Sequence, residues 1–414
     1  MNRRRFLKTI ALSTLCAEGP ALLGRESLPS ASKSTSVRLD TDGMLVVNQR
    51  REFMLGLYML PNAPEPWREA QDAGFNLVHV RPEAADFATA HAHSLYGWTS
   101  LGSISPRNRA EVQERIRKTV TVLKSEPALL FWETEDEPTF VWKKTEARVP
   151  PADIIETSRF VRSLDAAHPL YLNHSPTNLV STLQGYNEGA DIVATDIYPV
   201  IPHGIRESYA LWPDGQQGDL LNPTISQVGQ YADKMRQVAG PRRAVFMVLQ
   251  AFAWENLRDK DRNPGMILYP TRRQLRFMAW QSFVHGVNGL LYWGLAFTPP
   301  EASLWNDLKT VARELHELKD SLAAHKSSLP LQLTYHDTGH SLDRGIEWTA
   351  RPAKQDAILI AVNADRNPVE VTFGGLRKFR NCQVLFESRT MNLPQGNLRD
   401  SFAPFDTHIY RLSV

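Results

Sequence analysis

Short apolar segments alternate with amphipathic segments of helical period from residue 53 to about residue 300. The predicted strands lie at 53–59, 76–81, 95–101, from 128 onward, 169–174, 191–196, 243–250 and 289–293. Predicted helices between them include 66–73, 107–124, 151–164, 225–238 and 271–285. A strand–helix repeat of this length and order predicts a closed (β/α)₈ barrel.

The segments on either side of this repeat have a different pattern. Residues 37–39 and 45–47 flank Asp40-Thr41-Asp42-Gly43, which predicts a β-hairpin before the barrel. A last helix is predicted over 301–325. Short alternating segments follow at 331–335, 346–348, 357–362, 369–373, 382–386 and 407–412. We therefore predict a hairpin and barrel over 37–325 and a β-sandwich over 326–414, joined by almost no linker.

The N-terminus has the order of a cleavable export signal over residues 1–31. A basic start precedes an apolar stretch of small residues from Thr9 to Leu23. The basic start matches the twin-arginine pattern at Arg3, Arg4, Phe6, Leu7 and Lys8. A basic general-secretion signal is the alternative. Either signal predicts a periplasmic or secreted protein, and its removal with Cys16 leaves Cys382 alone, which excludes an internal disulfide and a cysteine-rich metal site.

Composition narrows the class of function. The 414 residues carry 47 Lys and Arg against 45 Asp and Glu, with no basic block beyond the first few residues. That pattern argues against nucleic-acid binding. No apolar run in the body of the chain is long enough to cross a bilayer, so we expect no membrane association after signal removal. Ten Trp and eleven Tyr are typical of a protein that stacks flat ligands such as sugar rings.

An acidic run ends the fourth predicted strand. Glu133, Glu135, Asp136 and Glu137 fall within five positions of Trp132-Glu133-Thr134-Glu135-Asp136-Glu137-Pro138. The carboxyl ends of barrel strands carry the working residues of such barrels. Strand alternation predicts that Glu133, Glu135 and Glu137 face the barrel mouth and Asp136 faces away. Crowding would raise the pKa values of these carboxyls, as a general acid requires. The alternative is a solvated loop whose carboxylates pair with Lys143, Lys144 or Arg148.

In order along the chain, these motifs resemble those of clan A glycoside hydrolases. The segments that carry the resemblance are 45–58, 73–81, Asp136-Glu137-Pro138, Asp196-Ile197-Tyr198-Pro199, 286–293 and the sandwich end at 402–410. The resemblance covers nearly the whole mature chain. It implies hydrolysis of a glycosidic bond in an oligo- or polysaccharide, with no cofactor and no metal. The oligomeric state stays open.

The resemblance makes Glu137 the general acid. Clan A enzymes carry this Glu after an Asn in Asn-Glu-Pro, and here Asp136 takes the place of the Asn. With Glu135, Asp136 is assigned to substrate binding.

The second catalytic carboxylate is open. Clan A places a nucleophilic Glu at the end of strand seven, where this chain has Gln250. An amide cannot form the glycosyl ester, so Gln250 is assigned to substrate binding. Asp196 is the first candidate, as an inverting base, or else a structural residue that bonds strand-end amides. Glu255, in the next loop, is the second. The third is a substrate acetamido group, because the Glu133-x-Glu135-x-Glu137 ladder is similar to the chitinase-type motif.

Further binding residues follow from the resemblance and from strand ends. Arg81 ends strand two and either lies beside the second carboxylate or pairs with a helix. Tyr198 resembles a Tyr that bonds the catalytic carboxylate, or is a core residue. Trp293, with Tyr292, resembles a sugar-stacking floor. His174 would bind a sugar hydroxyl, although a lone His is more often structural. Trp98 and Trp254 are further candidate stacking platforms.

Gln250 also motivates a rival of another class. A barrel that has lost its nucleophile would bind carbohydrate without cleaving it. The sandwich as an independent carbohydrate-binding module is a further alternative, although the short connection favours a packing partner for the barrel.

Overall fold

The computed structural model describes residues 34–140, 147–203, 222–258, 260–336 and 339–414. The export signal predicted within 1–31 and the predicted partners Lys143 and Lys144 lie outside these residues. Eight parallel strands close into a barrel in the order β10-β11-β4-β5-β6-β7-β8-β9, as the sequence predicts. The strands are β4 (Met54–Leu57), β5 (Leu77–His79), β6 (Tyr96–Ser100), β7 (Leu129–Asp136), β8 (Leu170–His174), β9 (Ile192–Ile197), β10 (Ala244–Gln250) and β11 (Gly289–Trp293).

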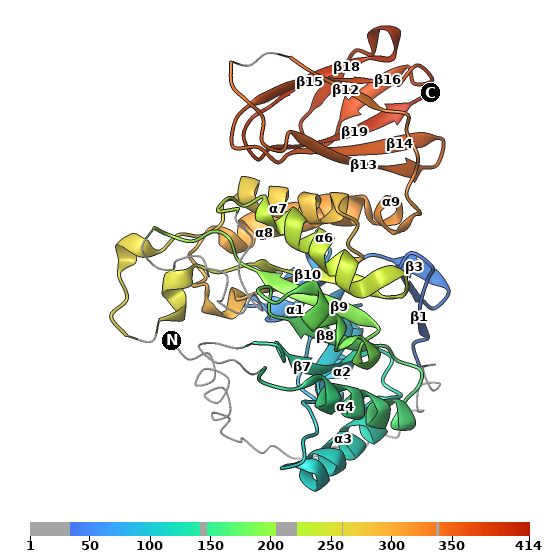
Figure 1. Ribbon diagram of the computed structural model, residues 1–414, viewed down its shortest axis with the longest axis vertical. Helices are drawn as coiled ribbons and strands as arrows, with labels where there is room; N and C mark the ends of the chain where they lie inside the picture. The colour runs from blue at the N-terminus through green and yellow to red at the C-terminus, as the bar shows by residue number, and fades with distance from the viewer. Residues whose placement is uncertain (1–33, 141–146, 204–221, 259, 337–338) are drawn as a thin grey trace, which may run out of the picture.

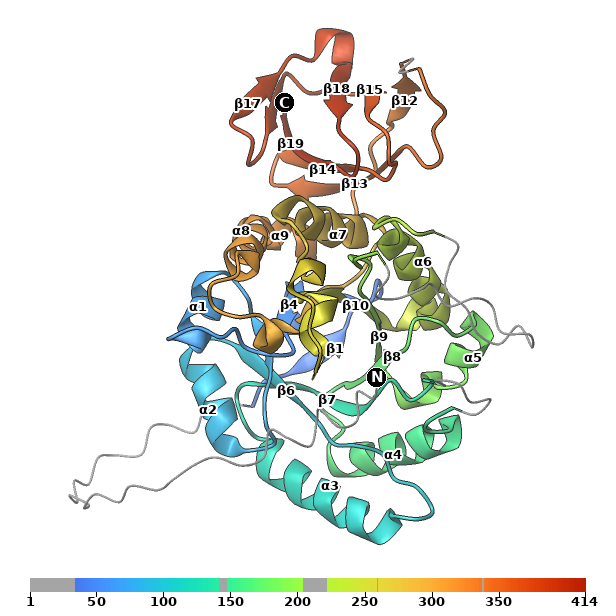
Figure 2. The ribbon, with the colours of Figure 1, turned by 90° about the vertical axis from the view of Figure 1, so that its left-hand side faces the viewer.

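Helices surround this ring of strands (Figure 2). They are α1 (Pro66–Asp72), α2 (Ala84–Ala92), α3 (Arg109–Leu123), α4 (Pro151–Leu164), α5 (Val180–Gln184), α6 (Gln227–Ala239), α7 (Arg272–Val284), α8 (Leu304–Glu317) and α9 (Lys319–Ala323). Their apolar residues repeat at helical spacing; α3, for example, buries Val112, Ile116, Val120 and Leu123. The pattern predicted one helix over 301–325, where the structure has α8 and α9.

The N-terminal hairpin closes the amino end of the barrel. Strands β1 (Val37–Leu39), β2 (Leu45–Val47) and β3 (Arg50–Glu52) form an antiparallel sheet. Leu45 and Val47 belong to the same apolar cluster as the inward-facing barrel residues. Asn48 and Gln49 both have positive φ, which makes a tight hairpin turn and adds a third strand to the predicted hairpin. The hairpin fills the interior of the barrel at its amino end, so a site inside the barrel must open at the carboxyl end.

The C-terminal strands form the predicted β-sandwich. One sheet has the order β12-β15-β18 and the other β13-β14-β19-β16-β17. Their bounds are β12 Gln332–Tyr335, β13 Ile346–Ala353, β14 Asp356–Asn363, β15 Val369–Gly374, β16 Asn381–Val384, β17 Arg389–Met391, β18 Leu398–Phe402 and β19 Thr407–Ser413. The alternation pattern missed β17 and β18, which are short or mixed in polarity. The apolar faces of the two sheets share one core.

The sandwich rests on the side of the barrel, above α7 and α9 (Figure 1). His285, at the end of α7, hydrogen-bonds Asp233 of α6 at 2.8 Å and Glu347 of β13 at 2.9 Å. Burial opposes its charge, but the two carboxylates raise the pKa of His285 to about 9. The Arg351 guanidinium lies 4.6 Å from the centre of the Phe283 ring. Polar and cation–π contacts thus fix the sandwich to the helical layer.

Candidate active site

A register shift in β7 sets the directions of the acidic side chains. Glu133 pairs with Tyr171 of β8, and the next pair joins Asp136 to Asn173. Three steps along β7 therefore match two along β8, which is a β-bulge. Glu133 and Asp136 both face the barrel axis as a result. The predicted alternation, with Glu135 facing the mouth and Asp136 facing away, is wrong because it assumed a regular strand.

Contacts of Asp136 confirm its inward direction. The Asn173 side chain donates from Nδ2 to Asp136 Oδ1 at 3.0 Å. Its negative charge also helps to raise the pKa of Glu133, Tyr58 and Tyr171, so the carboxylate lies within electrostatic range of all three.

Glu135 points to the outer side of the strand. It accepts a hydrogen bond from Ser103 Oγ at 2.6 Å and forms an ion pair with Arg148 at 2.9 Å. Arg148 also donates to the backbone carbonyls of Asp136 and Glu137. For Glu135, the alternative of a carboxylate paired with Arg148 is therefore what the structure shows. Arg148 holds the bulge from outside.

Glu133 lies at the floor of the barrel mouth and is only 1% exposed. One oxygen accepts from Ser100 Oγ at 2.7 Å and from Trp98 Nε1 at 3.1 Å. The other accepts from the Tyr58 hydroxyl at 3.2 Å, and Tyr58 in turn bonds the Tyr171 hydroxyl at 2.8 Å. Burial and then the charge of Asp136 raise the pKa of Glu133 to about 8.

Asp196 faces the axis from β9. Ile192 and Ala194 lie in the inner barrel cluster, and Asp196 is the next residue in this two-residue repeat. Its side chain is buried. Burial raises the pKa of Tyr171 far above its usual value, and the negative charges of Glu133, Asp136 and Asp196 add to the effect. Carboxylates from β7 and β9 are therefore grouped around Tyr171.

Glu137 is buried at the end of β7 and has a φ of 45°. Its backbone N–H donates to the carbonyl of Asn173 at 2.9 Å, which holds this conformation. A left-handed backbone costs free energy for a residue with a side chain, and such strain clusters at functional sites. Its role as general acid stays a prediction.

Gln250 has a complete set of backbone partners. Its Oε1 accepts from the Val200 N–H at 2.9 Å, and its Nε2 donates to the carbonyls of Val200 at 2.9 Å and Phe252 at 3.0 Å. The side chain is fully buried. Gln250 therefore fastens the loop after β9 to the end of β10, and a Glu could not make the two donated bonds.

Two predicted charged residues lie away from the axis. Arg81 pairs with Asp86 of α2, with Nη2 to Oδ1 at 2.8 Å, and its side chain is 70% exposed. The structure thus shows the helix-facing salt bridge. The Glu255 carboxylate is fully buried, accepts from the Asn263 N–H and lies 3.5 Å from Arg258, so it holds the loop after β10 in shape.

Three predicted ligand-binding side chains are not accessible to a sugar. His174 is fully buried on the outer face of β8 against Tyr186, and burial, then the charge of Lys234, lowers its pKa to about 3. Tyr292 is also fully buried and packs edge-on against Phe75 in the helical layer. Trp98 is buried beneath the mouth, where it donates to Glu133. For these residues the predictions of substrate contact are wrong.

An aromatic group lines the strand ends beside Asp196. Trp293, half-buried, stacks on Tyr198 at 5.7 Å between ring centroids and meets Phe252 edge-on at 5.1 Å. The Trp254 indole donates to the Tyr198 carbonyl at 3.2 Å. Trp293, Tyr198 and Trp254 therefore form one aromatic group at the strand ends, and their roles in sugar binding stay predictions.

Tyr58, Ser100, Tyr171 and Asn173 are site residues that sequence reasoning missed. All lie near the carboxyl ends of predicted strands, at positions whose side chains alternate toward the barrel axis. Strand-end position combined with a polar side chain was the available signal. In the described ranges, no cluster of His, Cys, Asp or Glu has the arrangement of a metal site. No helix of the described chain has both the length and the apolar character to span a membrane.

Comparison with solved structures supports the fold. An α-amylase from Geobacillus thermoleovorans, solved with acarbose, is 11% identical with a TM-score of 0.53; the match covers 87% of this chain and 98% of the amylase. A GH27 β-L-arabinopyranosidase from Geobacillus stearothermophilus, solved with arabinose, is 9% identical with a TM-score of 0.55, covering 88% and 97%. No family model and no curated protein matches the sequence. At such low identity the likeness is one of fold.

We predict that Gln250→Glu destabilises the protein by about 2 to 4 kcal/mol, because it buries an anion against two carbonyl oxygens. Urea unfolding at pH 7 measures the change. Gln184→Glu is the matched control: Gln184 also donates to one carbonyl, but it is exposed, so a change below about 0.5 kcal/mol is expected. A Gln250→Glu protein as stable as the control would contradict the claim that Gln250 fastens the loop after β9 to the end of β10.

A second prediction concerns Glu133. Its pKa rises on folding, so the native state holds more protons than the unfolded state between pH 4.5 and about 8. Glu133 therefore lowers the stability of the wild type as pH rises through this window, by at most roughly 5 kcal/mol. Urea unfolding of the wild type and of Glu133→Gln is measured at several pH values in this window. As pH rises, the free energy of unfolding of the variant should increase relative to that of the wild type. His79 Nε2 lies 3.8 Å from Glu133, so the pair is also compared in a His79→Gln background; the other histidines are common to both proteins and cancel. A constant difference would exclude a raised pKa.

Proposed function

We propose that this chain is a glycoside hydrolase that cleaves a glycosidic bond of an oligo- or polysaccharide with carboxylates from β7 and β9. The observation that carries the proposal is the inward direction of Asp136 together with Asp196 on the same axial face. The half-buried rings of Trp254 and Trp293, packed against buried Tyr198, are of the kind that sugars stack on. That solved structures with this fold are hydrolases of glycosides is in keeping with the proposal.

Strand geometry suits two-carboxylate hydrolysis. Neighbouring strands lie about 4.8 Å apart, and β8 separates β7 from β9, so the two backbones are about 10 Å apart. Side chains that converge on the axis shorten this gap. Glycosidases hold their two carboxyl groups roughly 5 to 9.5 Å apart, on either side of the scissile bond. We propose that Asp136 and Asp196 form such a pair.

The raised pKa of Glu133 indicates which carboxyl group at the floor carries the negative charge. Burial and the charge of Asp136 raise the pKa of Glu133, which favours its protonated form and leaves the negative charge at the floor on Asp136. Asp136 is accordingly the ionised group, which attacks the anomeric carbon or activates water. The proton donor must stand across the bond, and we assign this role to Asp196 on the strand beyond β8. Glu137, the donor predicted from the motif, adjoins Asp136; if it donates, Asp196 is the base and Asp136 holds the sugar.

Asp196 is required under either assignment. Gln250, at the end of β10, and Glu255, in the following loop, hold the backbone in shape, and the proposal gives them no step in the reaction. Hydrolysis by carboxylates consumes only water, so the proposal includes no cofactor. It also includes export by the signal predicted within residues 1–31, which would bring the enzyme to polysaccharides outside the cytoplasm.

The test is to incubate the full chain with a panel of polysaccharides and to measure hydrolysis as the release of reducing ends. On any substrate that is cut, we expect Asp196→Asn to lose at least about 1,000-fold in kcat. Asp191→Asn is the matched control, because Asp191 directly precedes the same strand and pairs with Arg162 outside the barrel; it should retain activity. Glu137→Gln separates the two assignments, with the larger loss expected if it is the donor. Full activity in Asp196→Asn, or no cleavage of any glycan, would refute the proposal.

A further inference from the structure

A cavity of about 410 Å³ lies where the sandwich meets the barrel. Its walls come from the second half of α6, the end of α7, the segment after α9 and strand β13. The charged residues that line it are Asp233, Arg236, His285, Lys326, Glu347 and Arg351. The volume is in the range of small-molecule sites. It lies near Gly286, which precedes β11, and so belongs to the amino end of the barrel, away from the candidate active site.

Arg351 is the unusual member of this lining. It is 7% exposed, yet no described carboxylate lies within ion-pair distance of its guanidinium. Its Nη1 donates to Thr349 Oγ1 at 2.9 Å and to the Ala350 carbonyl at 3.1 Å. Nε has no acceptor in the described chain. Burying a cation without a counter-charge is costly, and a guanidinium has five N–H donors to satisfy.

The other cations of the cavity lack counter-charges as well. Arg236 is half-buried and Lys326 is exposed, and neither forms an ion pair with any described residue. The two carboxylates of the lining are already bonded by His285, at 2.8 Å for Asp233 and 2.9 Å for Glu347. His285 is protonated at neutral pH, with a pKa of about 9, and offsets one of these two carboxylates, so four cations against two anions leave the lining with a net charge of +2. An anion that enters the cavity would meet uncompensated positive charge.

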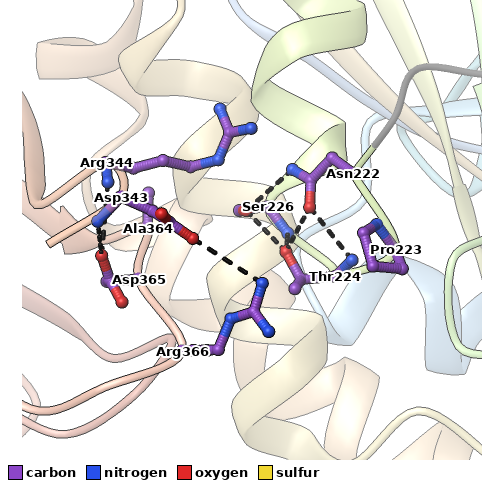
Figure 3. A pocket seen from close by; sticks show the side chains of 9 residues that line it. All are labelled: Asn222, Pro223, Thr224, Ser226, Asp343, Arg344, Ala364, Asp365 and Arg366. Atoms are coloured by element: carbon purple, nitrogen blue, oxygen red, sulfur yellow. Dashed lines mark hydrogen bonds and ion pairs between the residues drawn. The ribbon is translucent and has the colours of Figure 1, made fainter. Parts of the chain in front are cut away.

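The second cavity at the same junction does not have this character. It is smaller, about 70 Å³, and lies between the start of α6 and loops of the sandwich (Figure 3). Its Arg366 pairs with Asp343 at 3.6 Å. Asp365 accepts from the backbone N–H groups of Asp343 and Arg344. Charges there are matched within the protein, so the excess of cations is specific to the larger cavity.

We propose that the larger cavity binds a small organic anion, a molecule of sugar size that bears a carboxylate or a phosphate. Its oxyanion is held by Arg351 with Arg236 and Lys326. Guanidinium groups recognise carboxylate and phosphate through paired N–H donors, which suits both kinds of anion. The proposal is independent of glycoside hydrolysis, because the cavity and the carboxylates of β7 and β9 lie at opposite ends of the barrel.

Isothermal titration calorimetry of the full chain tests this proposal. The probes are D-glucuronate, D-glucose 6-phosphate, neutral D-glucose and inorganic phosphate. We expect one of the two sugar anions to bind at least tenfold more tightly than inorganic phosphate, and glucose to show no binding. The tighter of the two identifies the oxyanion as carboxylate or phosphate. No binding of either anion, or binding no tighter than that of inorganic phosphate, would overturn the proposal.

Variants locate the binding. Arg351→Gln should weaken the anion at least tenfold, and the double variant Arg236→Gln with Lys326→Gln provides the same readout at positions that are less buried and so tolerate substitution. Lys354→Gln is the matched control, because Lys354 is exposed at the far end of the β13–β14 hairpin. Unchanged affinity in the double variant, with thermal unfolding like that of the wild type, would place the anion elsewhere and overturn the assignment.

Discussion

The bulge in β7 is the constraint on which the candidate site depends. It lets one strand direct Glu133 and Asp136 to the barrel axis while Glu135 points outward to Arg148. Arg148 bonds the carbonyls of Asp136 and Glu137 from outside, and Asn173 bonds the Asp136 carboxylate from inside. Without the bulge, Asp136 would face the helices and the axis would lose the carboxylate nearest to Glu133. A one-residue change of register thus decides which acid is available to a substrate.

The buried polar network beneath Asp136 makes this arrangement stable. Glu133 would be costly to bury as an anion, but it accepts three hydrogen bonds and its pKa is raised to about 8. A neutral carboxyl at the floor reduces repulsion with the charged group above it. The same network fixes Tyr58 and Tyr171, whose rings fill the barrel beneath the mouth. Packing of the barrel and the chemistry proposed for it therefore rest on the same side chains.

Sequence periodicity was sufficient for the eight barrel strands and for most strands of the sandwich, since each depends on local patterns; it missed the short or polar strands β3, β17 and β18. Side-chain direction was not predictable in the same way. Barrel strands are buried on both faces, so hydrophobicity does not tell Tyr292, which faces the helices, from Trp293, which faces the mouth. No residue of the acidic run 133–137 indicates from the sequence that β7 contains a bulge. The structural role of Gln250 depends on its hydrogen bonds to Val200, which lies 50 positions away in a loop. That contact cannot be read from the sequence, where Gln250 looks like a replaced nucleophile.

The central claim is that Asp136, and not Glu135, faces the substrate. The most direct measurement is kcat/KM for Asp136→Asn and Glu135→Gln, on a glycan that the wild type cleaves, with circular dichroism to verify both folds. The account predicts a loss of at least about 1,000-fold for Asp136→Asn. For Glu135→Gln it predicts a change of only a few fold, because Ser103 and Arg148 hold that side chain outside the barrel. Equal losses in the two variants, or an active Asp136→Asn enzyme, would contradict it.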